Sequence, residues 1–366
     1  MRIVVSGGGT GGHIYPALMI AEHAIKMEPG SECLYIGTAN GLEAKIVPKS
    51  GIAFETIEIS GFRRSLSFEN VRTIIRFWRG VQRAKRLLLA FRPDVVIGTG
   101  GYVCAPVVYA AAKLGIPTMI HEQNAIPGLT NAFLSRYVDS VAVSFRQTIR
   151  HFRKARTVTY TGNPRASAVV AADAQAGREA FAIPQGVPIV LIFGGSRGAL
   201  AINNAVLEMM PQMVADQSAH FVYVTGEYYF ERVAQQVSER IGPLPTHVHL
   251  VPYVYNMPQL LAATSLMVGR AGASSLAELT ALGIPSILIP SPNVTNNHQE
   301  KNALALVESG AAVMIREADL SGSLLFERIK QMMSAPQRMK SMAQQAKNLG
   351  QPNAIELLFV ALRKIM

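Results

Sequence analysis

The first residues whose spacing suggests chemistry are Gly7, Gly9 and Gly12, which directly follow the apolar run 2–6. A glycine turn between a strand and a helix offers main-chain N–H groups to phosphate and permits close approach. Dinucleotide-binding loops share this spacing, but they also require an acidic residue at the end of the second strand. The segment 36–39 (IGTA) has none. A dinucleotide site is therefore disfavoured, while an anion-binding loop and a turn that only permits tight packing both stay open.

One titratable residue, His13, closes this glycine turn. A histidine in the first turn of a helix, at the carboxyl end of a strand, lies where α/β proteins bind ligands. The positive end of the helix favours the neutral imidazole, which suits a general base. A lone histidine is more often structural, so both interpretations remain.

A second candidate site is the segment 269–279 (GRAGASSLAEL), which follows a predicted strand and opens a helix. Ala273 and Ser274 would present N–H groups at the helix start, and Glu278 would lie about one turn further along. A carboxylate there can accept two hydrogen bonds from a ribose diol. The alternative is a glutamate that interacts only with the helix dipole.

The elements that position these residues alternate between strand and helix. Apolar strands separated by helical patterns are typical of parallel sheets covered on both faces. Strands are predicted at 2–6, 33–36, 54–59, 94–97, 118–121 and 138–143, and again at 188–193, 220–225, 247–251, 266–268 and 286–289. We therefore expect two Rossmann-like domains that meet near the Gly- and Pro-containing segment 160–165.

Length and composition agree with this arrangement. A chain of 366 residues is too long for one core, and 49% apolar with 16% charged residues excludes disorder. Cys33 and Cys104 lie in apolar stretches and are predicted to be free thiols of a reducing compartment. The first residues do not resemble a signal peptide, and no apolar run reaches about 18 residues, so we expect no membrane-spanning helix.

The positive charge is concentrated in the first half of the chain. Residues 1–165 contain 21 Lys and Arg against 10 Asp and Glu, whereas residues 166–366 contain 14 of each. The whole net charge of +11 therefore lies before residue 166. Such an asymmetry points to an anionic partner, either a nucleic acid or a membrane surface, unless it is accidental.

Much of this charge follows a helical pattern between residues 62 and 92. Arginines recur every three or four residues and form one stripe, with an apolar stripe beside it. Three interpretations remain open: a solvated face of a packed helix, a surface for anionic lipid, and a nucleic-acid surface. The residues predicted to form a membrane patch are Phe68, Val71, Arg72, Ile75, Arg76, Trp78, Arg79 and Arg83.

Six motifs together reveal a family resemblance: GGTGGHIYPAL, HEQNAIPG, TGNPR, GGSRGA, GRAGASSLAE and NNHQEKNA. In this order they resemble the bacterial cell-wall N-acetylglucosaminyltransferases that convert lipid I to lipid II. The resemblance implies the GT-B fold, with two Rossmann-like parallel-sheet domains facing a central cleft. It places an acceptor and membrane-associating domain at 1–163 and a UDP-N-acetylglucosamine (UDP-GlcNAc) domain at 164–349. The last helix, about 350–366, would return to the first domain.

The resemblance also assigns roles to particular residues. His13 is the implied general base, and Glu278 is the implied ribose ligand. The other implied substrate-binding residues are Thr10, Gly11, Gly12, Asn124, Arg165, Ser196, Val254, Ala273, Ser274, His298 and Gln299. Family members often have Asp before the NNHQ segment, where this chain has Asn296 and Asn297.

The resemblance implies an inverting transfer of GlcNAc from UDP-GlcNAc to the C4 hydroxyl of the muramyl sugar of lipid I, in peptidoglycan synthesis. The sequence has no Asp-x-Asp motif on a suitable loop, so we expect neither a metal nor another cofactor. The expected partners are the donor, the lipid-linked acceptor and an anionic membrane surface, with no nucleic acid. The acceptor cannot leave the bilayer, which favours a peripheral location on the cytoplasmic face of the cell membrane.

Overall fold

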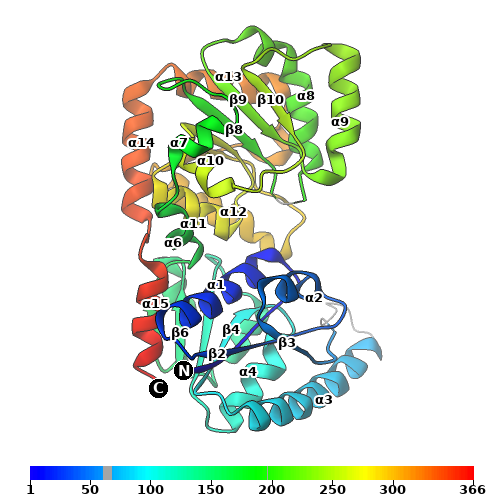
Figure 1. The fold of residues 1–366 in the computed structure, drawn as a ribbon, viewed down its shortest axis with the longest axis vertical. Helices are drawn as coiled ribbons and strands as arrows, with labels where there is room; N and C mark the ends of the chain where they lie inside the picture. Colours follow the sequence, from blue (N-terminus) through cyan, green and yellow to red (C-terminus); the bar gives the residue numbers. More distant parts are fainter. Residues whose placement is uncertain (61–67, 196) are drawn as a thin grey trace. The chain divides into compact units, whose positions relative to one another are not determined.

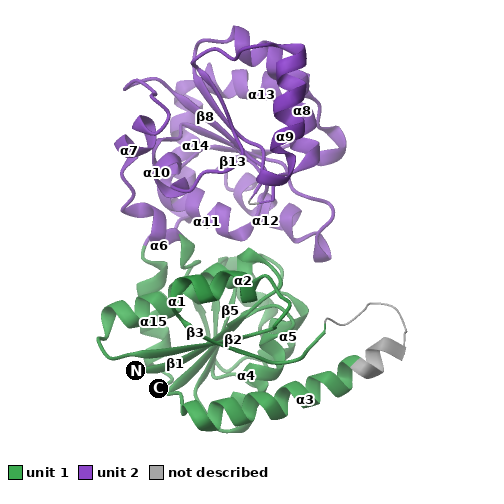
Figure 2. Ribbon diagram, turned by 45° about the vertical axis from the view of Figure 1, so that its right-hand side comes forward, with its two compact units in different colours: residues 1–165, 353–366 green, residues 166–352 purple. Residues whose placement is uncertain are grey.

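The computed structural model describes residues 1–60, 68–195 and 197–366; for residues 68–72 it describes the main chain alone. The chain divides into two compact units, coloured separately in Figure 2. Unit 1 comprises Met1–Arg165 and Asn353–Met366, and unit 2 comprises Ala166–Pro352. Each unit contains one parallel sheet with helices on both faces (Figure 1). The predicted class, two Rossmann-like parallel-sheet domains, is confirmed.

The sheet of unit 1 has seven strands in the order β3-β2-β1-β4-β5-β6-β7. The strands are β1 Arg2–Gly7, β2 Glu32–Gly37, β3 Ala53–Thr56, β4 Val95–Gly100, β5 Thr118–Glu122, β6 Ser140–Val143 and β7 Val158–Tyr160. The strand expected at 54–59 ends earlier because β3 is an edge strand. Among the described strands it pairs with β2 alone, and β2 ends at Gly37, which pairs with Thr56.

Helices cover both faces of this sheet. They are α1 Gly11–Met27, α2 Glu43–Ile46, α3 Phe68–Phe91, α4 Cys104–Lys113, α5 Leu129–Leu134 and α15 Ala354–Arg363, with 3₁₀ turns at Val47–Ser50 and Arg146–His151. The short helix α6 Arg165–Val170 begins with the last residue of the first segment of unit 1 and continues into unit 2. One core joins α1 and α15 to the sheet, and the other joins α3 and α4 to its opposite face. In the first core the ring of Phe359 lies 4.6 Å from that of His23. Burial of this apolar surface, about 25 cal/mol per Å², holds the last helix on unit 1.

Unit 2 repeats the plan with six strands in the order β10-β9-β8-β11-β12-β13. The strands are β8 Ile189–Phe193, β9 His220–Val224, β10 Val248–Val251, β11 Leu266–Gly269, β12 Ser286–Leu288 and β13 Ala312–Met314. The helices are α7 Ala174–Glu179, α8 Leu200–Ala215, α9 Glu227–Arg240, α10 Met257–Ala263, α11 Ala273–Leu282, α12 His298–Val307, α13 Gly322–Met333 and α14 Pro336–Leu349, with 3₁₀ turns at Thr295–Asn297 and Glu317–Asp319. Because all strands of each sheet are parallel, the loops after them gather at one edge, where ligands bind in such folds.

Candidate active site

The imidazole of His13 is fixed by the glycine turn that precedes it. His13 is the third residue of α1, and its main-chain N–H donates to Thr10 O at 3.1 Å. Its Nδ1 lies 2.9 Å from Gly8 O and 3.4 Å from Thr10 Oγ1. Because a carbonyl oxygen can only accept, Nδ1 carries the proton of the neutral ring and Nε2 keeps the basic lone pair. The ring is thus held in the tautomer that a general base at Nε2 needs.

The same ring lies against the end of β4. A Cβ added to Gly100 would come within 2.9 Å of Cδ2 and 3.0 Å of Nε2 of His13, and Gly100 has a φ of +108°. Both observations require glycine at this position. The adjacent Thr99 is buried and donates its hydroxyl to His13 O at 2.7 Å. Neither residue was predicted to belong to the site, although the GTGG run at 98–101 was a signal for them.

The other predicted residues of this turn surround the start of α1. Thr10 is the N-cap residue with an extended backbone, and its carbonyl accepts from the N–H groups of His13 and Ile14. Thr10 and Gly12 are exposed and Gly11 is half-buried. The first N–H groups of a helix have no acceptor within it, so this exposed turn can bind polar groups of a ligand.

Asn124 follows β5 at the same edge of the sheet and is held by a buried carboxylate. Oε1 of Glu122 accepts the main-chain N–H of Asn124 at 2.9 Å and its side-chain amide at 3.3 Å. Oε2 of Glu122 accepts from Gly128 N and from Asn131 Nδ2. Glu122 therefore shapes the loop that presents Asn124. This role was not predicted, because spacing does not show that the loop after β5 turns back onto Glu122.

His121, the residue before Glu122, is structural. It is fully buried, its Nε2 lies 2.9 Å from Gly162 O, and Nε2 of Gln123 lies 3.0 Å from its Nδ1. Burial lowers the pKa of His121 to about 4, so the ring is neutral at physiological pH. It connects the end of β5 to the segment that leads to Arg165.

Arg165 begins α6 and belongs to unit 1. Its guanidinium lies 5.7 Å from the centre of the Tyr15 ring on α1, within the range of a cation–π contact. Burial raises the pKa of Glu22 on the same helix, while the charge of Arg165 acts in the opposite direction. The structure therefore brings Arg165 close to the helix that carries His13.

In unit 2, three of the residues predicted to bind the nucleotide-sugar donor lie in the first two turns of α11. Ala273 is its first residue, Ser274 is half-buried, and Glu278 is only 7% exposed on the next turn. The buried hydroxyl oxygen of Ser274 has no hydrogen-bond partner among the described residues. An orphaned hydroxyl beside helix-start N–H groups is well suited to an anionic ligand.

The remaining predicted residues of unit 2 lie on neighbouring loops. Val254, 9% exposed, lies between β10 and α10. His298 and Gln299 begin α12; Nδ1 of His298 lies 2.8 Å from Thr295 O, and Gln299 Oε1 accepts from Ser291 N at 2.9 Å. Ser196 lies outside the described residues. In the described parts of the chain, no three His, Cys, Asp or Glu side chains gather as metal ligands would.

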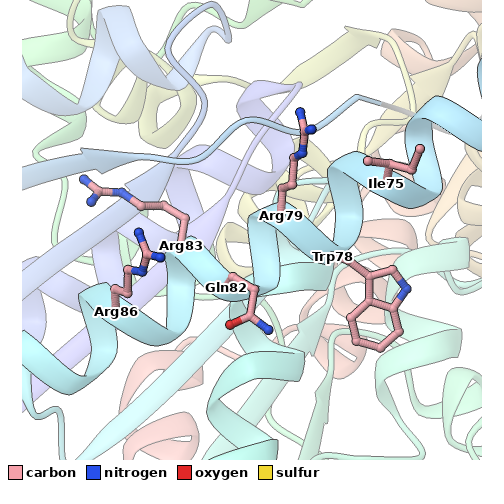
Figure 3. A pocket seen from close by; sticks show the side chains of 6 residues that line it. All are labelled: Ile75, Trp78, Arg79, Gln82, Arg83 and Arg86. Atoms are coloured by element: carbon pink, nitrogen blue, oxygen red, sulfur yellow. The ribbon is translucent and has the colours of Figure 1, made fainter.

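The predicted membrane patch lies on α3 (Figure 3). Ile75 is 49% exposed and Trp78 is 52% exposed, and Arg76 is exposed beside them. An open groove of about 480 Å³ is lined by Ile75, Trp78, Arg79, Gln82, Arg83 and Arg86. The side chains of Phe68, Val71 and Arg72 lie outside the described residues. Exposed apolar and basic side chains therefore share one stretch of this helix.

Aromatic residues from two further helices extend this patch, which the sequence analysis did not foresee. The rings of Trp78, Tyr109 and Phe133 gather around Phe77 at centroid distances of 5.6 to 6.2 Å. Phe133 is 37% exposed. The ammonium of Lys113 lies 5.5 Å from the centre of the Tyr109 ring. The patch thus combines cations with aromatic rings, both of which suit a membrane interface.

Known proteins match the chain along its full length. The N-terminal domain model of glycosyltransferase family 28 matches residues 3–143, and its C-terminal domain model matches residues 189–358. A protein of Bacillus cytotoxicus, named UDP-N-acetylglucosamine–N-acetylmuramyl-(pentapeptide) pyrophosphoryl-undecaprenol N-acetylglucosamine transferase, is 52% identical over 366 residues and covers 100% of both chains. The relative of the same name from Halalkalibacterium halodurans is 54% identical over 365 residues, with 100% of this chain and 99% of the relative covered.

Solved structures agree with these matches. MurG of Acinetobacter baumannii superposes with a TM-score of 0.79 at 27% identity, covering 99% of each chain. A UDP-GlcNAc 2-epimerase of Neisseria meningitidis has a TM-score of 0.69 at 15% identity over 100% of both chains, which shows a shared fold alone. The family resemblance and the GT-B fold predicted from the motifs are confirmed. The chain therefore belongs to glycosyltransferase family 28, together with these full-length N-acetylglucosamine transferases.

Proposed function

We propose that this chain transfers GlcNAc from UDP-GlcNAc to the C4 hydroxyl of the muramyl sugar of lipid I, which yields lipid II and UDP. The observation that carries this proposal is the 52% identity, over all 366 residues, to a transferase named for this donor and this class of acceptor. The reaction needs a base for the acceptor hydroxyl and a ligand for the ribose of the donor. The geometry of His13 suits the first requirement, and the buried carboxylate of Glu278 suits the second.

His13 is the general base of the proposed reaction. The acceptor oxygen attacks the anomeric carbon of GlcNAc from the face opposite UDP and forms the new C–O bond. The bond between the anomeric carbon and the diphosphate oxygen breaks in the same displacement, and UDP leaves with the electron pair. The hydroxyl proton goes to Nε2 of His13, since Nδ1 already donates to Gly8 O.

Unit 2 binds the donor in this proposal. The N–H groups of Ala273 and Ser274 face the diphosphate with the positive end of α11, and Glu278 accepts hydrogen bonds from the ribose. Val254 contacts the uracil, and Gln299 with His298 reads the sugar hydroxyls. Ser196 and Arg165 add a hydroxyl and a cation for the leaving diphosphate. Preorganised dipoles and a fixed cation can stabilise this charge without a metal.

Unit 1 binds the acceptor at the membrane. The patch on α3 holds it against anionic lipid, with arginines on phosphates and Trp78 and Ile75 at the acyl boundary. No helix in the described ranges has the length and apolar character to cross a bilayer. We propose a peripheral location on the cytoplasmic face of the bacterial cell membrane, where the lipid-linked acceptor is found. Lipid, rather than nucleic acid, is then the anionic partner of the basic half.

A transfer assay with a short-chain lipid I analogue tests the proposal. We expect incorporation of radiolabelled GlcNAc with UDP-GlcNAc as donor, and much slower reaction with UDP-GalNAc or UDP-glucose. Release of UDP should depend on the acceptor. Epimerisation of UDP-GlcNAc in the absence of an acceptor would contradict the proposed reaction. Equal rates with all three donors would contradict it as well.

A further inference from the structure

A buried carboxylate lies behind the first glycine turn. Glu43 begins the short helix α2 and is 0% exposed. Its Oε2 accepts the main-chain N–H of Gly9 at 3.2 Å, and its Oε1 accepts both the N–H of Thr38 at 3.1 Å and the Thr38 hydroxyl at 2.6 Å. Burying a carboxylate is costly unless donors replace its water, and here three donors do so.

Glycines around Glu43 create the room for its carboxylate. A Cβ on Gly8 would lie 2.7 Å from Oε1, and one on Gly41 would lie 2.2 Å from the same oxygen. A Cβ on Gly37 would lie 2.8 Å from Cγ of Glu43. Part of the glycine pattern therefore accommodates a side chain of this protein, and a phosphate is not needed to explain it.

The polar main-chain groups of the turn are bound from several sides. Gly7 O accepts from Tyr35 Oη at 2.6 Å, Gly8 N donates to Gly100 O at 3.2 Å, and Gly8 O lies 2.9 Å from His13 Nδ1. Burial, with the negative charge of Glu43 adding to it, raises the pKa of Tyr35 well above its ordinary value, so its hydroxyl stays a donor. Gly8 O, which orients the imidazole, thus lies directly before the peptide N–H that Glu43 binds.

We propose that Glu43 is the resident anion of the first glycine turn and a positioning residue for His13. Its carboxylate takes the Gly9 N–H, so this one N–H is closed to phosphate, whereas the first N–H groups of α1 stay open to a ligand. The carboxylate also fixes the peptide that holds Gly8 O against Nδ1 of His13. The effect on catalysis rests on the proposed function; the occupation of the Gly9 N–H by Glu43 does not.

Glu43→Gln tests the need for a carboxylate at constant shape. An amide has one NH₂ group, which must face either Gly9 N–H or the two donors of Thr38, so at least one donor pair clashes. We expect kcat for transfer to fall about 10- to 100-fold, with KM for UDP-GlcNAc unchanged within about twofold. Glu32 is an exposed carboxylate at the other end of β2. The variant Glu32→Gln is the matched control and should keep full activity.

Glu43→Ala tests the anion itself. This variant leaves a space lined by the three donors, which formate can fill. We expect formate to raise the thermal midpoint of Glu43→Ala and to restore kcat at least about tenfold, with no effect on the unchanged protein. If Glu43→Ala does not fold, Gly41→Ala replaces it, because its new Cβ displaces the carboxylate while keeping its charge. Gly41→Ala should then reproduce the loss of kcat seen in Glu43→Gln.

The outcomes separate the two proposals. Full kcat in Glu43→Gln would overturn the positioning role. A rise in KM for UDP-GlcNAc together with a fall in kcat, with no response of Glu43→Ala to formate, would overturn it as well. Binding of inorganic phosphate to the Gly9 N–H of the unchanged protein, detected by a shift of the Gly9 amide resonance, would overturn the occupation of this N–H by Glu43. If the unchanged protein transfers no GlcNAc, the proposed function fails, whereas the formate-dependent stability of Glu43→Ala still tests Glu43.

Discussion

The position of the proton on His13 decides what this residue can do. Contact with Gly8 O fixes the proton on Nδ1, and the glycine at position 100 leaves room for the edge of the ring that carries Nε2. A base placed in this way removes a hydroxyl proton in the transition state and contributes about 10²- to 10⁴-fold to the rate. Its loss should therefore affect turnover more than substrate binding.

We accordingly expect His13→Ala to lower kcat about 100- to 1000-fold while the Kd of UDP stays within about twofold. Steady-state transfer assays and calorimetric titration with UDP measure the two quantities. His151→Ala, an exposed histidine of the same unit, serves as the control and should behave like the unchanged protein. Full turnover in His13→Ala would assign the base to another group.

Glu278 gives a second prediction at this scale. Glu278 is buried, and in the proposed reaction its carboxylate accepts two ribose hydroxyls, at least one of which it loses when it becomes an amide. We expect Glu278→Gln to raise KM for UDP-GlcNAc about tenfold. The unchanged protein should bind 2′-deoxy-UDP more weakly than UDP, whereas Glu278→Gln should discriminate less between them. Equal discrimination between UDP and 2′-deoxy-UDP in both proteins would place the ribose elsewhere. Glu231→Gln, at an exposed position of α9, is the control and should behave like the unchanged protein.

At the scale of elements, α3 has one face buried in unit 1 and another face exposed. Val81, Ala84 and Leu88 are buried in a core of unit 1, and Trp78 and Arg79 are exposed. A helix anchored by its apolar face can present cations and aromatic rings without needing lipid to fold. Binding to anionic vesicles should therefore be electrostatic, reversible and sensitive to salt.

Reversal of three exposed arginines on α3, Arg76, Arg79 and Arg86, to Glu should reduce binding to anionic vesicles more than about 100-fold at low salt. Arg83 is left in place because it pairs with Glu55 at 3.3 Å. The same reversal of Arg232, Arg240 and Arg338 in unit 2 changes the net charge equally and should have little effect. Co-sedimentation measures both. If both triple variants lost vesicle binding equally, the net charge of the protein, and not the patch on α3, would explain the binding.

Elements defined by local pattern were predicted better than contacts made across the fold. The glycine turn, the helix start at His13 and the arginine stripe all follow from spacing within a few residues. Glu43 and Glu122 were missed because spacing does not show which donors fold onto a carboxylate. The Gly9 N–H reaches Glu43 from the turn after β1, and the loop after β5 turns back so that Asn131 of α5 reaches Glu122. The aromatic extension of the patch was missed for the same reason, since Tyr109 lies on α4 and Phe133 on α5, well outside the arginine pattern.

At the scale of the whole molecule, each unit carries its own histidines with lowered pKa values, His121 buried in unit 1 and His220 and His249 half-buried in unit 2, so the units should respond to acid separately. In unit 2, His220 Nδ1 lies 3.1 Å from His249 Nε2, and burial together with the neighbouring histidines lowers the pKa of both. In unit 1, burial alone lowers the pKa of His121 to about 4. Unfolding exposes these rings, which then bind protons near their ordinary pKa of about 6.5.

The sign of the effect of His121 follows from this difference. Between pH 6.5 and about 4 the unfolded chain binds a proton that the folded unit does not, so the stability of unit 1 falls as the pH falls through this window. From pH 7 to pH 5 the loss of folding stability due to His121 is about 2 kcal/mol.

The only tryptophan, Trp78, lies in unit 1, so its fluorescence during urea unfolding reports on that unit. We expect His121→Gln to lower stability at pH 7, because Gly162 O loses its donor, and to flatten the pH dependence by about this amount. His23, whose pKa burial also lowers, contributes equally to both proteins and cancels in the comparison. Identical pH slopes for the two proteins would show that folding does not lower the pKa of His121.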